Sequence, residues 1–182
     1  AASVSPVLSV RNLTTSFLSD GEWRSVVRNV SFDVMPGETV AIVGESGSGK
    51  SVTSLSIMRL LAKGSSRVEG SITLTGRDVL SLSDREMRAV RGKDAAMIFQ
   101  EPMTSLNPAF TIGSQMAEVL TRHKGGSRAA ALDRAAELMG RVGITAPGMR
   151  LGQFPHQLSG GLRQRVMIAM ALMCDPELLI AD

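Results

Sequence analysis

Residues 44–51 read Gly44-Glu45-Ser46-Gly47-Ser48-Gly49-Lys50-Ser51. The stretch matches the pattern G-x-x-x-x-G-K-[ST]. It lies between an apolar run at 39–43, which predicts a short buried strand, and a helical pattern at 52–61. Its glycines allow backbone N–H groups to turn inward around phosphate oxygens, and the helix adds the positive end of its dipole. Lys50 would then reach the terminal phosphates, and the Ser51 hydroxyl would bind Mg²⁺. The stretch predicts a phosphate-binding loop, and a glycine-rich surface turn is the alternative.

Two further apolar runs, at 95–99 and 178–181, also predict short buried strands. They alternate with helical patterns along the chain, and this alternation predicts an α/β fold with a parallel sheet. A helical block interrupts the alternation, with helical patterns at 112–142 and 162–173 and a loop-like segment at 143–155 between them. The remaining predicted elements are strands at 7–13, 26–34 and 71–75 and a short polar helix at 83–91.

Two polar features accompany these elements. Asp182 follows the run at 178–181, and an acidic residue in such a place beside a phosphate-binding loop orients the metal, although a turn cap is the alternative. The segment 158–161 (Leu-Ser-Gly-Gly) precedes a helix, where Ser159 would be an N-cap or part of a second anion site. Two phosphate-type sites more than 100 residues apart suggest that two copies enclose the nucleotide between them.

Composition narrows the function classes. Twenty basic against 17 acidic residues give a net charge of +3 without a basic tail, and aromatic residues make up 3%, so nucleic-acid binding is disfavoured. The single cysteine, Cys174, excludes an internal disulfide framework and is expected in the core. The longest apolar run, at 166–174, is far too short to span a membrane, and the first residues lack the profile of a secretory signal. We therefore expect a soluble domain.

Taken in order, the loop at 44–51, Gln100, the segment at 158–161 and the run at 178–182 resemble the nucleotide-binding domain of ABC transporters. They correspond to that family's Walker A loop, Q-loop glutamine, signature motif and Walker B strand. The resemblance implies a P-loop NTPase fold, with a mostly parallel sheet, antiparallel N-terminal strands and an inserted helical subdomain. It also implies one domain over residues 1–182, C-terminally incomplete after Walker B: the core comprises 1–108 and 174–182, and the helical subdomain about 109–173.

The segments 97–108 and 155–172 are similar to the ATPases of bacterial dipeptide, oligopeptide and glutathione importers. This resemblance implies an ATPase bound peripherally to the cytoplasmic face of the bacterial inner membrane. Its partners would be permease subunits, a second nucleotide-binding domain and, indirectly, a substrate-binding protein; nucleic acid is not expected. Because the glutathione type fuses two such domains, the second domain could be identical, homologous or fused.

The resemblance also assigns roles to residues, with ATP and Mg²⁺ as cofactors. Gln100 would contact Mg²⁺ or the attacking water, and with Lys50 and Asp182 it forms the expected catalytic set. Phe17 lies near the position where the family stacks an aromatic ring on adenine, and Trp23 is a rival. The signature would touch the γ-phosphate bound to the opposite subunit of a head-to-tail dimer; its residues are Ser159, Gly160 and Gly161.

Two departures bear on activity. Leu162 stands where the signature commonly continues with Gln, so a polar contact is lost. The family's catalytic Glu would be at position 183 and its switch histidine later, so residues 1–182 alone are expected to bind ATP without efficient hydrolysis. Two alternatives stay open: a soluble ABC-type ATPase that acts on nucleic acid or ribosomes, and a non-catalytic nucleotide-binding regulatory half.

Overall fold

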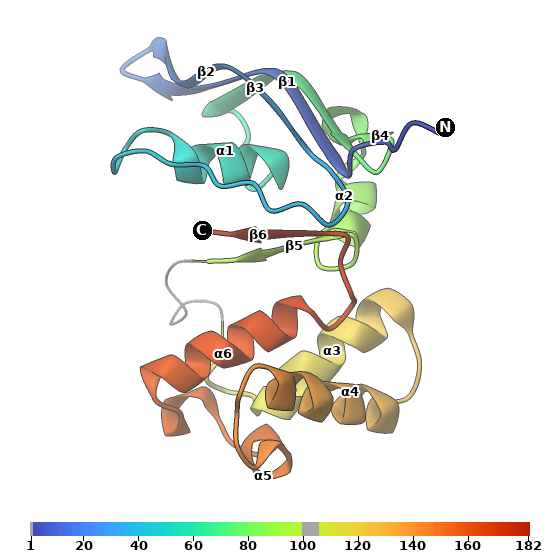
Figure 1. The fold of residues 1–182 in the computed structure, drawn as a ribbon. Helices are drawn as coiled ribbons and strands as arrows, with labels where there is room; N and C mark the ends of the chain where they lie inside the picture. The colour runs from blue at the N-terminus through green and yellow to red at the C-terminus, as the bar shows by residue number, and fades with distance from the viewer. Residues whose placement is uncertain (1, 100–105) are drawn as a thin grey trace. The chain divides into compact units, whose positions relative to one another are not determined.

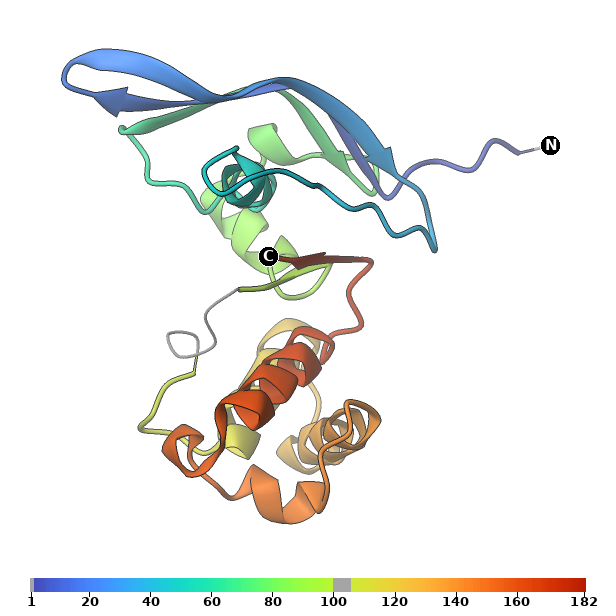
Figure 2. The same cartoon turned by 60° about the vertical axis from the view of Figure 1, so that its left-hand side comes forward.

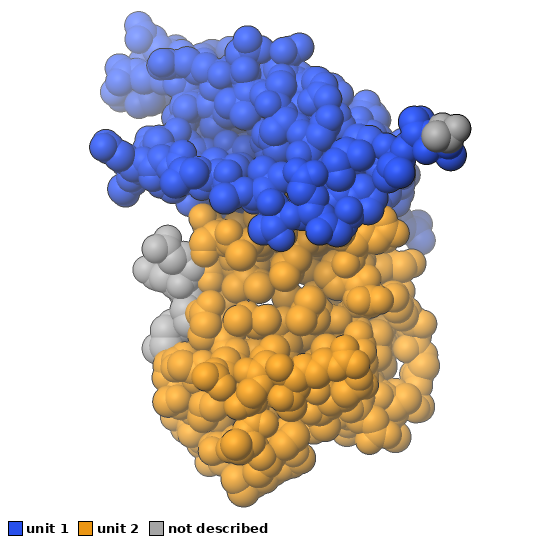
Figure 3. All heavy atoms as spheres, in the orientation of Figure 1, with its two compact units in different colours: residues 1–87 blue, residues 88–182 orange. Residues whose placement is uncertain are grey.

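The computed structural model describes residues 2–99 and 106–182. The chain forms two compact units, one ending at Met87 and one beginning at Arg88, shown in two colours in Figure 3. Each unit is described by itself.

The first unit is built on a four-stranded antiparallel sheet with strand order β2-β1-β3-β4 (Figure 1). A two-residue turn, Asp20-Gly21, joins the long strands β1 and β2, and both of its residues have positive φ, as tight hairpins require. The predicted strands 7–13 and 26–34 lie within these longer strands, which continue to the turn. The bounds are β1 (Leu8–Ser19), β2 (Glu22–Val34), β3 (Ser66–Leu74) and β4 (Arg77–Asp78).

One face of this sheet packs into the apolar core of the first unit. Leu8 pairs with Leu74 and Val10 with Ile72 across β1 and β3, and all four side chains are buried. In both views the three long strands lie along one side of helix α1 (Figures 1 and 2). The helical elements of this region are α1 (Lys50–Ile57), the 3-10 turn η1 (Val79–Ser81) and α2 (Asp84–Val90), which contains the division between the units.

The prediction of a buried strand at 39–43 was wrong for the structure described. The segment forms no ladder with the described residues, and its side chains are exposed, up to 91% for Val43. β-Branched residues favour an extended backbone, but a strand also needs a neighbour to hydrogen-bond with and a surface that covers its side chains. Those two conditions are not local properties of the sequence.

The second unit contains a parallel strand pair, β5 (Ala95–Ile98) and β6 (Leu178–Ala181), in the register Ala95 to Leu178. Both runs are therefore strands, as predicted, but the predicted burial holds only for β5, because in β6 Leu178 is buried and Leu179 is 43% exposed. The expected helical stretch 112–142 is two helices, because Gly125 and Gly126 both have positive φ and end the first of them. The segment 143–155, expected as a loop, contains a short helix with Pro147 as its first residue. The helical elements are α3 (Ile112–Lys124), α4 (Arg128–Arg141), α5 (Pro147–Leu151), η3 (Pro155–Gln157) and α6 (Gly160–Ala171).

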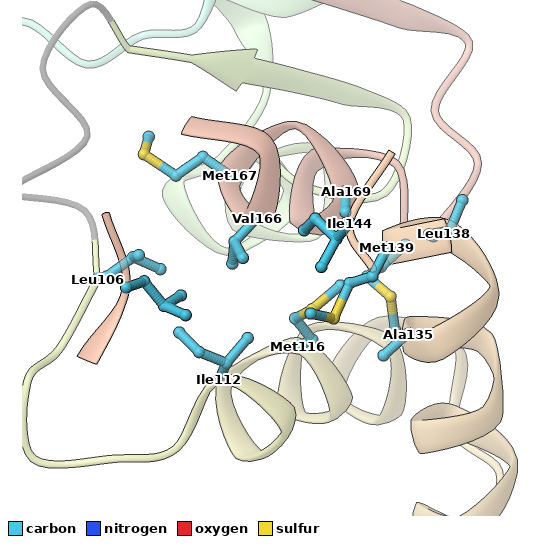
Figure 4. Close-up of a cluster of buried hydrophobic side chains, with 12 residues drawn as sticks. Leu106, Ile112, Met116, Ala135, Leu138, Met139, Ile144, Val166, Met167 and Ala169 are labelled. Atoms are coloured by element: carbon cyan, nitrogen blue, oxygen red, sulfur yellow. The ribbon is translucent and has the colours of Figure 1, made fainter. Parts of the chain in front are cut away.

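Helices α3, α4 and α6 enclose a methionine-rich core, in which side chains from the three helices point toward one another (Figure 4). Met116, Met139 and Met167 are all buried there, and such flexible thioether side chains fill irregular gaps in a core. None of the helices in the described part of the chain has the length and apolarity that crossing a bilayer requires.

Two titratable side chains of the second unit illustrate the effect of burial. Burial raises the pKa of the Cys174 thiol above its ordinary value, so Cys174 is an unreactive core residue, as expected. Burial, with the positive charge of Arg122 as a second cause, lowers the pKa of His123 and favours its neutral form.

Gly70 lies in a β-bulge where β3 and β1 change register between Arg11 and Thr14. Its φ is +105°, and a Cβ atom there would lie 2.5 Å from the carbonyl oxygen of Asn12. Gly76 has a similar φ of +83°, but a Cβ atom would meet nothing within 4 Å among the described residues. Both positions therefore favour glycine through φ, and only Gly70 also needs the space.

We predict that Gly70→Ala destabilises the protein much more than Gly76→Ala. The left-handed φ alone should cost about 1 kcal/mol in Gly76→Ala. In Gly70→Ala the close contact should raise the loss of unfolding free energy to about 3 kcal/mol, because the backbones of β1 and β3 must move apart. Urea unfolding of the two variants measures both free energies. Equal losses would contradict the role given to the close contact.

Candidate nucleotide site

The loop at 44–51 is held in shape by two glycines with left-handed backbone. Gly47 has φ +82° and Gly49 has φ +96°. The N–H of Ser48 donates to the carbonyl oxygen of Glu45 at 3.0 Å and closes a turn. At Gly49 a Cβ atom would lie 3.2 Å from the carbonyl oxygen of Val26, so glycine lets the loop approach strand β2 closely.

Lys50 and the start of α1 make this loop a region of positive potential. The Lys50 ammonium donates hydrogen bonds to the carbonyl oxygens of Gly44 and Glu45 and so lies over the loop. Helix α1 begins without a side-chain cap and without an acidic residue in its first turn. Neither a capping side chain nor an acidic residue of the first turn therefore competes with an anion for the positive end of its dipole. Ser51 is exposed at the second position of the helix.

Helix α1 is fixed to the sheet by a buried polar contact. The hydroxyl oxygens of Thr15 and Ser56 lie 2.8 Å apart, and Ser56 also donates to the carbonyl oxygen of Val52 at 2.7 Å. After the helix, Arg59 donates to the carbonyl oxygens of Val79 and Leu82. The C-terminal end of the helix is thus tied to neighbouring elements of the first unit.

The register of β1 and β2 separates the two aromatic candidates. The side chain of Thr15 faces α1, and alternation along β1 puts Phe17 on that same face. Ser16 points to the opposite face, where it bonds to Ser25 of β2 at 3.0 Å. Trp23, two residues before Ser25, shares that opposite face. Phe17 is therefore on the face of the sheet that carries α1, and Trp23 is not.

Trp23 has a partner on its own side of the sheet. The Arg67 guanidinium lies 4.5 Å from the centre of the indole ring, which is a cation–π contact. This contact gives Trp23 a role within the sheet, although its side chain stays 40% exposed.

In the second unit, Ser159 is the N-cap of α6, and its hydroxyl oxygen accepts from the N–H of Leu162 at 3.2 Å. The expected cap is therefore present. Gly160 and Gly161 have no positive φ, and a Cβ atom at either would meet nothing within 4 Å among the described residues. The fold of the described residues thus gives neither position a reason to be glycine. The side chain of Leu162 is partly buried against the helical core.

Asp182 lies at the carboxyl end of β6, where its N–H donates to the carbonyl oxygen of Ile98 at 2.9 Å. Because β5 and β6 are parallel, the residues that follow Ile98 begin at the same edge of the strand pair as Asp182. Gln100, the next predicted site residue, lies outside the described residues.

The second unit also has a hollow that the sequence did not indicate. It has a volume of about 260 Å³ and lies along α3, with Phe110, Glu118 and Arg128 among its lining residues. The Phe110 side chain is 55% exposed, and an exposed aromatic residue directly after the segment 97–108 is the signal that could have pointed to it.

Comparison with known proteins agrees with this geometry. A family model described as ABC transporter matches residues 27–182. The dipeptide transport ATP-binding protein DppD of Bacillus subtilis (strain 168) is 56% identical over 177 residues, which cover 97% of this chain and 53% of DppD. The glutathione import ATP-binding protein GsiA of Shigella dysenteriae serotype 1 (strain Sd197) is 53% identical over 182 residues, covering 97% of this chain and 29% of GsiA. The chain thus spans about half the length of DppD.

A solved structure shows the same fold. The dimeric, post-hydrolysis state of the ATP-binding cassette MJ0796, bound to ADP and Pi, superposes with a TM-score of 0.84 at 29% identity. The match covers 96% of this chain and 73% of that chain. The expected P-loop NTPase fold, with antiparallel N-terminal strands and a parallel strand pair, is confirmed by this similarity.

Proposed function

Because the chain belongs to the ABC transporter family, we propose that it is the ATP-binding and ATP-hydrolysing part of a protein that powers the import of peptides. Dipeptides and glutathione are substrates named for its relatives of greater length, and oligopeptides are a further candidate from the sequence resemblance. The observation that carries the proposal is the loop at 44–51, with its left-handed glycines, the Lys50 ammonium over it and the uncapped start of α1. The names of the relatives refer to the transport of a dipeptide or glutathione, and this favours peptide import over action on nucleic acid or ribosomes.

In this proposal the loop N–H groups, the α1 dipole and Lys50 bind the β- and γ-phosphates of ATP. Phe17 stacks on the adenine ring from the α1 face of the sheet. Hydrolysis is in-line attack of water on the γ-phosphate, and the protein contributes by orienting the phosphates and by neutralising the charge that develops on them. Gln100 would orient the attacking water.

The residues present also fit Mg²⁺. The Ser51 hydroxyl and the Asp182 carboxylate are hard oxygen donors, and Gln100 would be a further one. Mg²⁺ in phosphate sites takes only one or two protein ligands and completes its shell with phosphate oxygens and water. Accordingly, the described residues need not form a closed metal cluster, and they contain no group of three or more His, Cys, Asp or Glu that could hold an ion alone. When bound, Mg²⁺ supplies positive charge against the β- and γ-phosphate oxygens.

We further propose that Ser159, Gly160 and Gly161 bind the γ-phosphate held by a second nucleotide-binding domain in a head-to-tail dimer. The two glycines have open space and ordinary φ, so a partner that approaches closely from outside the chain explains them better than the chain's own packing. The MJ0796 cassette is dimeric with ADP and Pi bound. The second domain would be identical, homologous or fused.

The complete transporter would place this domain peripherally on the cytoplasmic face of the bacterial inner membrane, against permease subunits and, indirectly, a substrate-binding protein. The hollow beside Phe110 supports a permease contact, since it combines an exposed aromatic ring with the charges of Glu118 and Arg128. In the same proposal residues 1–108 and 174–182 form the core, and about 109–173 form the helical subdomain.

Lys50→Ala tests the proposed nucleotide site. Loss of a charge-assisted hydrogen bond to phosphate should weaken MgATP binding about tenfold or more, measured by isothermal titration calorimetry. Lys63→Ala is the matched control, because Lys63 is exposed and pairs with Asp84 instead. Unchanged MgATP affinity in Lys50→Ala would refute the site.

Gly161→Ala tests the proposed dimer contact in the complete transporter ATPase, because residues 1–182 alone are not expected to hydrolyse ATP efficiently. We expect ATP-dependent dimerisation and ATP hydrolysis to fall about tenfold or more, since the new methyl group blocks the approach of phosphate, while MgATP binding to the monomer stays unchanged. The free energy of unfolding should not fall, and it could rise by up to about 1 kcal/mol. Gly140→Ala in α4 is the control, because its Cβ atom would also meet nothing within 4 Å. Normal hydrolysis by Gly161→Ala would rule out the contact.

A further inference from the structure

Arg24 of β2 lies directly opposite Phe17 in the β1–β2 ladder. Side chains of directly opposed residues share one face of the sheet, about 5 Å apart at their Cβ atoms. The Arg24 and Phe17 side chains therefore leave the sheet side by side, on the face that carries α1 and the phosphate-binding loop. Both residues belong to the first unit.

Two independent contacts establish which face this is. Thr15, two residues before Phe17, bonds to Ser56 of α1. Val27, the cross-strand partner of Thr15, is buried, and a Cβ atom at Gly49 would lie 3.2 Å from its methyl group. The loop and the helix that follows it thus lie against the face from which Phe17 and Arg24 project.

The fold makes no evident use of Arg24. Among the other arginines of β1, β2 and β3, Arg11 pairs with Asp33 at 2.7 Å and Arg67 stacks on Trp23. Arg28 of β2 is exposed like Arg24, but it follows the buried Val27 and so lies on the opposite face. Arg24 is exposed, and it forms no hydrogen bond or ion pair with the described residues. Glu22 shares its face of the sheet, but no ion pair joins the two. An exposed arginine side chain on the same sheet face as a half-buried aromatic ring is suited to recognise a ligand that stacks on that ring.

We propose that Arg24 recognises the base of the nucleotide, by donating hydrogen bonds to acceptor atoms on the edge of the purine that stacks on Phe17. The proposal rests on the proposed function, which supplies the nucleotide. Guanidinium is a donor only, and purine ring nitrogens and the 6-oxo group of guanine are acceptors. Arg24 therefore accepts both adenine and guanine, and guanine presents the larger set of acceptors.

The test compares Arg24→Gln with Arg67→Gln in the full chain. Each removes one positive charge from the four-stranded sheet, but Arg67 belongs to β3 and lies on the opposite face with Trp23. The probes are MgATP, MgGTP and magnesium tripolyphosphate, which has the phosphates without a base. Dissociation constants are measured by calorimetry.

We expect Arg24→Gln to raise the dissociation constants of MgATP and MgGTP about tenfold or more, and to change that of tripolyphosphate by less than about twofold. Arg67→Gln should change the dissociation constants of all three probes by less than about twofold. Arg24→Lys, which keeps the charge without the planar fork, should recover only part of the loss. A thermal unfolding midpoint of Arg24→Gln equal to that of the wild-type chain would exclude a folding defect in this variant.

Two results would overturn the assignment of Arg24. Unchanged MgATP binding by Arg24→Gln would show that the guanidinium does not touch the base. Equal losses of affinity for tripolyphosphate and MgATP in Arg24→Gln would show that the guanidinium acts on the phosphates through its charge. Neither result contradicts the proposed nucleotide site, provided that Lys50→Ala weakens MgATP binding. A wild-type chain that binds none of the probes would overturn both the proposed nucleotide site and the role of Arg24.

Discussion

The close approach of Gly49 to strand β2 is the constraint on which the first unit depends. A side chain at that position would press on the carbonyl oxygen of Val26, so only glycine lets the loop lie against the strand. The approach brings the loop under the hairpin, and the buried hydroxyl pair of Thr15 and Ser56 holds the helix that follows. Loop, helix and hairpin are therefore joined by direct contacts, and the phosphate-binding loop and Phe17 lie on the same face of the sheet.

Local chemistry explains what could be predicted from the sequence. The loop at 44–51 is recognisable because its glycines and Lys50 act within a few residues of each other. Ser159 was predictable as a cap for the same reason, since its hydroxyl bonds three residues ahead. The strands at 95–98 and 178–181 were predictable because each is a short apolar run. Each strand also begins with a buried residue, Ala95 in one and Leu178 in the other.

What could not be predicted depends on contacts between distant residues. Burial at 39–43 requires a neighbouring strand, and nothing within those five residues specifies one. The choice between Phe17 and Trp23 required the register of β1 and β2, which a bulge at Val26 shifts by one residue. The Asp20-Gly21 turn, by contrast, was a local signal that would have revealed the full length of the hairpin. The open space around Gly160 and Gly161 depends on how distant segments fold around them, so the sequence alone does not reveal it.

The position of Trp23 has a spectroscopic consequence. Trp23 is the sole tryptophan of a sequence that has no tyrosine. Indole emission from this chain therefore comes from one known place, the outer face of the hairpin, with a guanidinium stacked on the ring. The signal follows the integrity of the sheet while standing apart from the face that carries the loop, so it gives the chain a built-in optical report of folding that bound nucleotide would not directly quench.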